Sequence, residues 1–162
     1  ILAVLLYGLE TVALTDQNKA KLDAFHFKAL RKLLGIKHAY WSRVSNQTAL
    51  ERANQRARLN GDKRIQVISA RLARRQITLF GHILRAEGGD IVKMHTVEPD
   101  GTRKRAGFRR VGRPRIKWYD MVRKLAVQDL VEQQIIPQDW ETYISYHEVT
   151  QLLVEAAQNR LF

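Results

Sequence analysis

DKRIQVISARLARRQITLFGHILRA, residues 62–86, is the stretch that decides the fold class of this chain. Five of its apolar residues fall on one arc when each residue is advanced by about 100°: Ile65, Ile68, Leu72, Leu79 and Ile83. The pattern predicts one amphipathic helix of about 35 Å, at ~1.5 Å per residue. Gly81 lies inside it, where glycine is about 1 kcal/mol less favourable than alanine, and indicates a bend or a close contact.

Further helices are predicted before this stretch. Residues 16–34 have apolar side chains at helical spacing, with Thr15 or Asp16 as the N-cap and Gly35 as the stop. A second, shorter helix is expected to begin at a cap formed by Ser45. The apolar run ILAVLLYGL at the start is far shorter than the ~20 residues needed to cross a bilayer, so we interpret it as a buried helix and expect no membrane contact.

Helical spacing returns after residue 117. One helix is predicted from Trp118 to about Leu130, and Pro137 opens another that reaches Ile144. Ser145 and Glu148 form a capping box that predicts a separate final helix. The expected fold is therefore all-α, with about six helices.

Between these groups of helices, residues 88–117 lose their periodicity and contain several glycines and prolines. We predict an irregular basic arm there, with a short strand over 91–97 as an option. The domain organisation that follows is a helical domain over 1–87, a basic linker or arm over 88–117, and a C-terminal helical subdomain over 118–162.

The net charge narrows the classes of partner. The 162 residues carry a formal charge of +12, and such a chain repels itself unless an anionic partner, most often nucleic acid, screens it. No cysteine is present, which excludes disulfides and zinc sites built on thiolates. Because the sequence opens at Ile1 inside an apolar pattern, we expect it to be part of a longer protein.

Two basic concentrations are candidate nucleic-acid contacts. In the predicted long helix no acidic residue lies between the first and last cation, whereas a helix that is merely solvated would alternate its charges. In the arm, eight cations fall within fifteen residues without one carboxylate, and its glycines and prolines let the cations follow a phosphate chain. The candidate residues are Lys63, Arg64, Arg71, Arg74 and Arg75 in the helix, and Arg103, Lys104, Arg105, Arg109, Arg110, Arg113, Arg115 and Lys117 in the arm.

Other interpretations of these cations stay open. The helix cations also fit a solvated surface, and the arm also fits a nuclear import signal, a contact to an acidic protein or, around Gly112 to Arg115, an AT-hook-like segment for the minor groove. Residues 128–162 carry a net charge of −5, with six carboxylates against Arg160. This region is expected to pack on protein rather than on phosphate.

Residues for catalysis are not apparent in the sequence. The carboxylates are scattered singly, the five histidines lack metal-ligand spacing, and neither a phosphate-cradling loop nor a nucleophile elbow occurs. We therefore predict no catalytic residue, no metal site and no cofactor within this chain. Tyr40, Trp41 and Phe108 are placed to stack on bases or, more commonly for aromatic residues, to pack in a core or an interface.

Five short strings, taken in order, resemble one family. They are LLYGLET (5–11), FHFKALRKLLGI (25–36), RVSN (43–46), FGHILR (80–85) and GRPRIKWYD (112–120). They resemble the region that follows the polymerase palm in LINE-type non-LTR retrotransposon reverse transcriptases. Departures occur at Leu9, Val12 and Ala29, and residues after about Val131 match poorly.

The resemblance implies thumb and connector helices, over residues 1–87, that grip RNA, DNA or an RNA–DNA hybrid. It also implies a nuclear location and an upstream polymerase domain in the same parent chain. In the family the catalytic aspartates, with their Mg²⁺, lie upstream of this region, so the chain would be a non-catalytic part of an RNA-directed DNA polymerase. A helical protein-interaction module with a basic arm, or a degenerate copy of such an element, remains the alternative.

Overall fold

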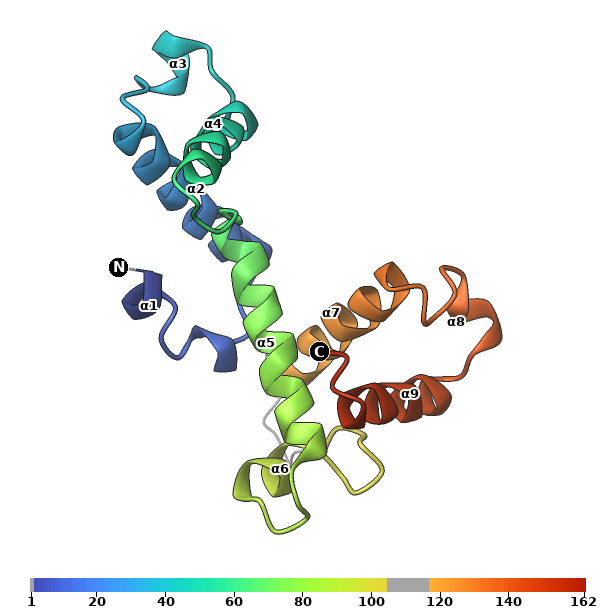
Figure 1. The fold of residues 1–162 in the computed structure, drawn as a ribbon. Helices are drawn as coiled ribbons and strands as arrows, with labels where there is room; N and C mark the ends of the chain where they lie inside the picture. Colours follow the sequence, from blue (N-terminus) through green and yellow to red (C-terminus); the bar gives the residue numbers. More distant parts are fainter. Residues whose placement is uncertain (1, 105–116) are drawn as a thin grey trace. The chain divides into compact units, whose positions relative to one another are not determined.

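The computed structural model describes residues 2–104 and 117–162, and within these ranges the regular elements are helices (Figure 1). An isolated antiparallel bridge between Val97 and Arg103 is the only β-type pairing found in the described ranges. The predicted all-α class is therefore confirmed. The elements are α1 (Leu2–Leu5), a 3₁₀ turn η1 (Leu9–Thr11), α2 (Asp16–Leu33), α3 (Ala39–Ser42), α4 (Asn46–Leu59), α5 (Ile68–Arg85), α6 (Ile91–Thr96), α7 (Trp118–Glu132), α8 (Trp140–Tyr143) and α9 (Tyr146–Gln158).

The chain forms two compact units. Unit 1 combines Ile1–Ala13 with Ala73–Phe162, and unit 2 is Leu14–Leu72. These limits differ from the boundaries near 87 and 117 that composition suggests. The difference arises because the apolar face of α5 belongs to a core that α7 and α9 complete, so the helices on the two sides of the arm fold as one unit.

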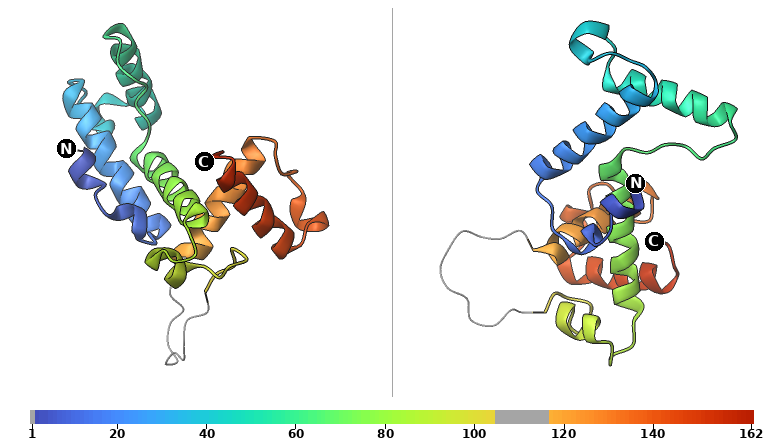
Figure 2. Two further views of the ribbon diagram at one scale, coloured as in Figure 1. Left: turned by 60° about the horizontal axis from the view of Figure 1, so that its bottom comes forward. Right: turned by 90° about the vertical axis from the view of Figure 1, so that its left-hand side faces the viewer.

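Unit 2 is built around the pair α2 and α4, whose packing can be followed in Figure 2. The Thr15 hydroxyl accepts a hydrogen bond from the Asn18 amide, as its predicted role as N-cap requires. Gly35, at φ 67°, ends α2, and the Ile36 amide bonds back to the Arg31 carbonyl. Ser45 caps α4 as predicted. Leu30, Leu50 and Ala53 form the core between the two helices.

The predicted helix over 62–86 begins later than expected, at Ile68. Gly61, at φ 74°, ends α4, and the Asn54 side chain then holds the backbone of Ile65 by accepting from its amide at 2.7 Å and donating to its carbonyl at 3.2 Å. These two bonds keep the connection out of helical geometry. Asp23 of α2 accepts from the Ser69 amide at 2.9 Å and so caps α5 from another helix.

Unit 1 has the larger core, formed by the second half of α5 with α7, α9 and the segments beside them (Figure 1). Phe80 lies fully buried in this core. The ring of Tyr119 lies edge-on to that of Phe80, with the two ring centroids 5.5 Å apart. A Cβ on Gly81 would lie 2.9 Å from the Phe162 ring, so the close contact predicted for this glycine is present. The capping box of Ser145 and Glu148 at the start of α9 is also confirmed.

Residues 90–104 are structured, where the sequence predicts an irregular arm or a short strand. The strand prediction for 91–97 is wrong, because Asp90 accepts from the Lys93 amide and starts α6 instead. The Lys93 ammonium also donates to the carbonyls of Leu84 and Ala86 at the end of α5. A tight turn follows α6, in which the Glu98 amide bonds to the Thr102 carbonyl at 2.8 Å.

Two shorter predictions also need correction. The run ILAVLLYGL is not one buried helix: α1 has four residues, Gly8 at φ 72° interrupts the chain, and Val4 and Tyr7 are exposed while Leu6 is buried. The helix expected from Pro137 to Ile144 is reduced to the four residues of α8.

Candidate nucleic-acid interface

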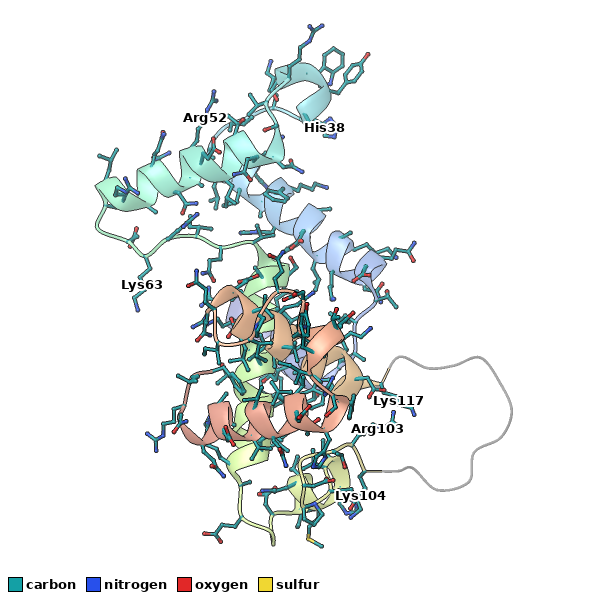
Figure 3. All side chains as sticks on the ribbon, turned by 90° about the vertical axis from the view of Figure 1, so that its right-hand side faces the viewer. His38, Arg52, Lys63, Arg103, Lys104 and Lys117 are labelled. Atoms are coloured by element: carbon teal, nitrogen blue, oxygen red, sulfur yellow. The ribbon has the colours of Figure 1, made fainter. Side chains whose placement is uncertain are left out.

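Three of the predicted arm cations line one pocket of unit 1. Arg103, Lys104 and Lys117 line one part of a hollow of about 480 Å³, and Trp118 forms part of its wall. The Val97–Arg103 bridge and a 3.1 Å bond from the Lys104 amide to the Thr96 carbonyl fix the first two residues. Lys117 is the N-cap residue of α7. Figure 3 labels the three side chains, which lie close to one another.

The charges in this pocket are not all free to bind an anion. The Arg103 guanidinium forms an ion pair with Asp120, with Nη1 2.8 Å from Oδ2. Lys104 and Lys117 are both exposed, and neither is within ion-pair distance of a carboxylate among the described residues. The two lysines are therefore the stronger candidates for a contact with phosphate.

The turn that carries Arg103 is tied to the core beneath the pocket. The buried Tyr119 hydroxyl donates a hydrogen bond to the Gly101 carbonyl at 2.7 Å. Burial raises the pKa of Tyr119 well above its usual range, so the hydroxyl stays a proton donor. Gly101 adopts φ 80°, and a Cβ there would lie 2.6 Å from Val154. Because the turn is anchored to buried side chains, the packed core fixes the positions of Arg103 and Lys104.

On α5, the three predicted arginines differ in their surroundings. Arg71 and Arg74 are exposed, and no carboxylate among the described residues is within ion-pair distance of either. Arg75 instead pairs with Glu10, its Nη2 3.1 Å from Oε1. The prediction that all three lack an internal partner is wrong for Arg75, because the segment before α2 brings a carboxylate to it.

Lys63 and Arg64 do not share a helix face with these arginines, as the 62–86 helix predicted. Both lie in the non-helical connection before α5. Arg64 lines a shallow hollow of unit 2 together with Arg58, Glu51 and Asp62. The two carboxylates there weaken the attraction for an anion, while Lys63, labelled in Figure 3, is exposed.

Arg105, Arg109, Arg110, Arg113 and Arg115 lie outside the residues that the structure describes.

Helix α4 carries exposed cations that lie outside the two dense basic runs of the sequence. They are Arg52, Arg56 and Arg58, of which Figure 3 labels the first. Arg52 and Arg56 are four residues apart and so lie on one side of α4. That spacing in the string ERANQRAR is the signal that identifies them. Arg56 and Arg58 also lie in the last turn, where cations stabilise a helix end.

The five strings quoted for the family resemblance contact one another within each unit. In unit 1, the Trp118 indole donates to the Glu10 carbonyl at 2.6 Å, and its ring centroid lies 6.3 Å from that of Phe80. In unit 2, the Arg31 guanidinium donates to the Val44 carbonyl and to Asn46 Oδ1. The strings thus supply contacts that hold each unit together.

The described ranges contain neither a candidate metal site nor a helix that could span a membrane. No three side chains of His, Cys, Asp or Glu gather there as a group that could hold a metal ion. None of the helices in these ranges is both long enough and apolar enough to cross a bilayer. Comparisons with protein-family models, with curated proteins and with solved structures find no match.

Proposed function

We propose that this chain binds nucleic acid through backbone phosphates, as a non-catalytic part of a retrotransposon RNA-directed DNA polymerase. The observation that carries the proposal is that Lys104 and Lys117 line the same pocket. In the sequence they flank residues 105–116, which contain five arginines and no carboxylate. Within this arrangement a phosphate is the natural counterion for the exposed ammonium groups.

Charge bookkeeping within the molecule favours an external polyanion. The chain has 28 Lys and Arg against 16 Asp and Glu, while the ion pairs found in the described ranges involve only Lys19, Arg75 and Arg103 among the cations. Cations that remain exposed repel one another and lower the stability of the folded state. A nucleic-acid strand removes that repulsion and releases its own condensed counterions.

The assignment to a polymerase parent rests on the resemblance. It is supported by the contacts among the five strings, because residues that a family repeats as short separate strings are expected to meet where they share a structural task. The parent's polymerase domain, with its Mg²⁺, would then precede this chain, and the chain would hold a template–primer duplex or target DNA in a nuclear setting. The pocket lysines would act there by position and charge.

The test is the salt dependence of binding to an RNA–DNA hybrid. Each phosphate contact lowers log K by ~0.7 to 0.9 per unit of log[salt]. Replacing Lys104 and Lys117 by glutamine should therefore flatten the slope by about 1.4 to 1.8 and weaken binding to hybrids of any sequence alike. Arg160→Gln is the matched control, because Arg160 is an exposed cation of unit 1 within the acidic C-terminal stretch.

Three results would oppose the proposal. Wild-type binding that does not change with salt excludes phosphate contacts. A loss of binding free energy in Arg160→Gln that is half that of the double variant, and so equal for each charge removed, means that net charge, rather than this pocket, governs binding. Absence of any gel shift at physiological salt, with retained binding to an acidic protein, favours the interaction-module alternative.

A further inference from the structure

Two neighbouring aromatic residues stand out from the surface of unit 2. Tyr40 and Trp41 belong to the short helix α3, and about three quarters of each residue (76%) is exposed to solvent. Their rings lie edge to face, with centroids 5.1 Å apart. Burying an aromatic side chain stabilises a protein by about 1.5–3 kcal/mol, so two adjacent rings left in water indicate a partner. Core packing, the commoner fate of such residues, does not apply to this pair.

The segment that carries the rings is held in place from below. Arg31 is buried, and its guanidinium donates to the carbonyls of Lys37 and Val44, to Ser42 Oγ and to Asn46 Oδ1. These acceptors lie on both sides of α3, so one side chain fixes the whole connection between α2 and α4. The rings are thus presented on a preorganised support, which lowers the entropy lost when a ligand binds.

The surroundings of the rings are basic. Residues 24–50 contain five Lys or Arg residues and no Asp or Glu. Lys37 and Arg43, which flank α3 in the sequence, are both exposed. Next to α3 lies a hollow of about 570 Å³ with Phe27 and Ile36 in its wall and Lys28 and Lys32 among its lining residues. Figure 3 labels His38, the N-cap residue of α3.

Exposed aromatic rings with cations beside them fit one class of ligand. A nucleobase offers a flat face to an aromatic ring, and the adjoining phosphates require cations within a few ångströms, which is the arrangement used to bind single strands. A base paired within a duplex has its faces covered by its neighbours and cannot offer them. An apolar protein surface would accept the rings but leave the surrounding cations without a partner.

We infer that Tyr40 and Trp41 stack on unpaired bases of a single-stranded nucleic-acid segment whose phosphates contact Lys37 and Arg43. This inference rests on the proposed binding of nucleic acid and adds a second, base-contacting surface to it. The surface lies wholly in unit 2, whereas the lysine pocket lies in unit 1.

The experiment compares ligands that share phosphates but differ in bases. Wild-type chain and a Tyr40→Ala, Trp41→Ala double variant are titrated with short oligothymidylate, with an abasic oligomer of the same length, and with a blunt duplex. Stacking contributes enough that loss of a ring weakens binding by roughly fivefold to 150-fold per base. The double variant should lose at least this factor on oligothymidylate and nothing on the abasic oligomer or the duplex.

Two further measurements guard against a merely misfolded variant. Trp41→Phe keeps a ring and should retain most of the affinity, while its intrinsic fluorescence should no longer show the quenching that oligothymidylate causes in the wild type. Circular dichroism of each variant should match the wild type. Lys37→Gln serves as the charge control, since it removes a phosphate contact and should weaken binding to the oligothymidylate and the abasic oligomer equally.

The outcomes separate this inference from the proposed function. If the wild type binds oligothymidylate and the abasic oligomer equally well, or the double variant loses both equally, stacking is excluded while phosphate binding stands. If the wild type binds none of the three ligands, the proposed function itself is wrong. If the double variant keeps its affinity for oligothymidylate but loses binding to phosphatidylserine vesicles, the rings serve a lipid surface instead.

Discussion

Replacing Arg31 by methionine should destabilise unit 2 more than any other removal of a single charge there. The substitution keeps an apolar stem of similar length but deletes the donors that reach Lys37, Ser42, Val44 and Asn46. A hydrogen bond that involves a charged group contributes about 1.5–3 kcal/mol. The contacts to Val44 and Asn46 are the shortest, and those to Lys37 and Ser42, at 3.4 and 3.5 Å, are weak.

These values predict a loss of about 2–4 kcal/mol, because the freed acceptors can partly return to water. A unit of about 60 residues has a total stability of only ~3–9 kcal/mol, so the loss takes a large share of it. Arg31→Lys should lose about half as much, since an ammonium group cannot reproduce the planar fork of donors. The expected order of stability is wild type, Arg31→Lys, Arg31→Met.

Amide hydrogen exchange is the suitable assay, because the chain has two units and need not unfold in one step. The slowest amides of α2 and α4 should exchange faster in Arg31→Met, while those of α7 and α9 stay unchanged. Lys32→Met is the control, as Lys32 is exposed on the same helix and should alter stability by no more than ~0.5 kcal/mol. Equal exchange in Arg31→Met and Lys32→Met would refute the role given to the guanidinium.

Gly101→Ala should destabilise unit 1 by about 2–4 kcal/mol, because the backbone there is left-handed and a Cβ would overlap Val154. Gly88→Ala is the control, since Gly88 has open space around it and the change should alter stability by under ~0.5 kcal/mol. Thermal unfolding measures both variants, and equal melting temperatures would contradict the prediction. For His26, burial lowers the pKa below its ordinary 6.5, with Asp23 opposing the shift. The unfolded chain then takes up a proton more readily than the folded one, so the stability that neutral His26 contributes is present above pH 6.5 and is lost as the pH falls below it. Urea unfolding at several pH values should show this fall in the wild type and a smaller one in His26→Gln, and identical pH profiles would count against the assignment.

Local signals predicted the helices well where cap, pattern and stop agree. Thr15 and Gly35 bound α2, Ser45 starts α4, and the Ser145–Glu148 box starts α9, because each acts within one turn of its own helix. The start of α5 was missed for the opposite reason. Asn54 and Asp23, which decide it, come from other helices and leave no trace in the periodicity of residues 62–86.

The candidate site likewise combines features that the sequence predicts with features that only the packing determines. The cations at 103, 104 and 117 are obvious in the sequence, yet their meeting at one pocket depends on the Val97–Arg103 bridge and on where α7 begins. Glu10 forms an ion pair with Arg75, and Asp120 forms one with Arg103, so two of the predicted contact residues already have an internal partner. Only packing brings these carboxylates close to the arginines. Conversely, the exposure of Tyr40 and Trp41 could not be read from a pattern that suits either a core or a surface.

The amino-acid sequence alone determined the all-α class, the helix ends set by neighbouring residues, and an excess of positive charge. Tertiary structure alone decided which segments share a core, which cations keep a free charge, and which aromatic rings remain in water. The physical reason is one of range. Capping and helical periodicity act over a few residues of one chain segment, whereas burial and ion pairing depend on distances between atoms that the sequence separates.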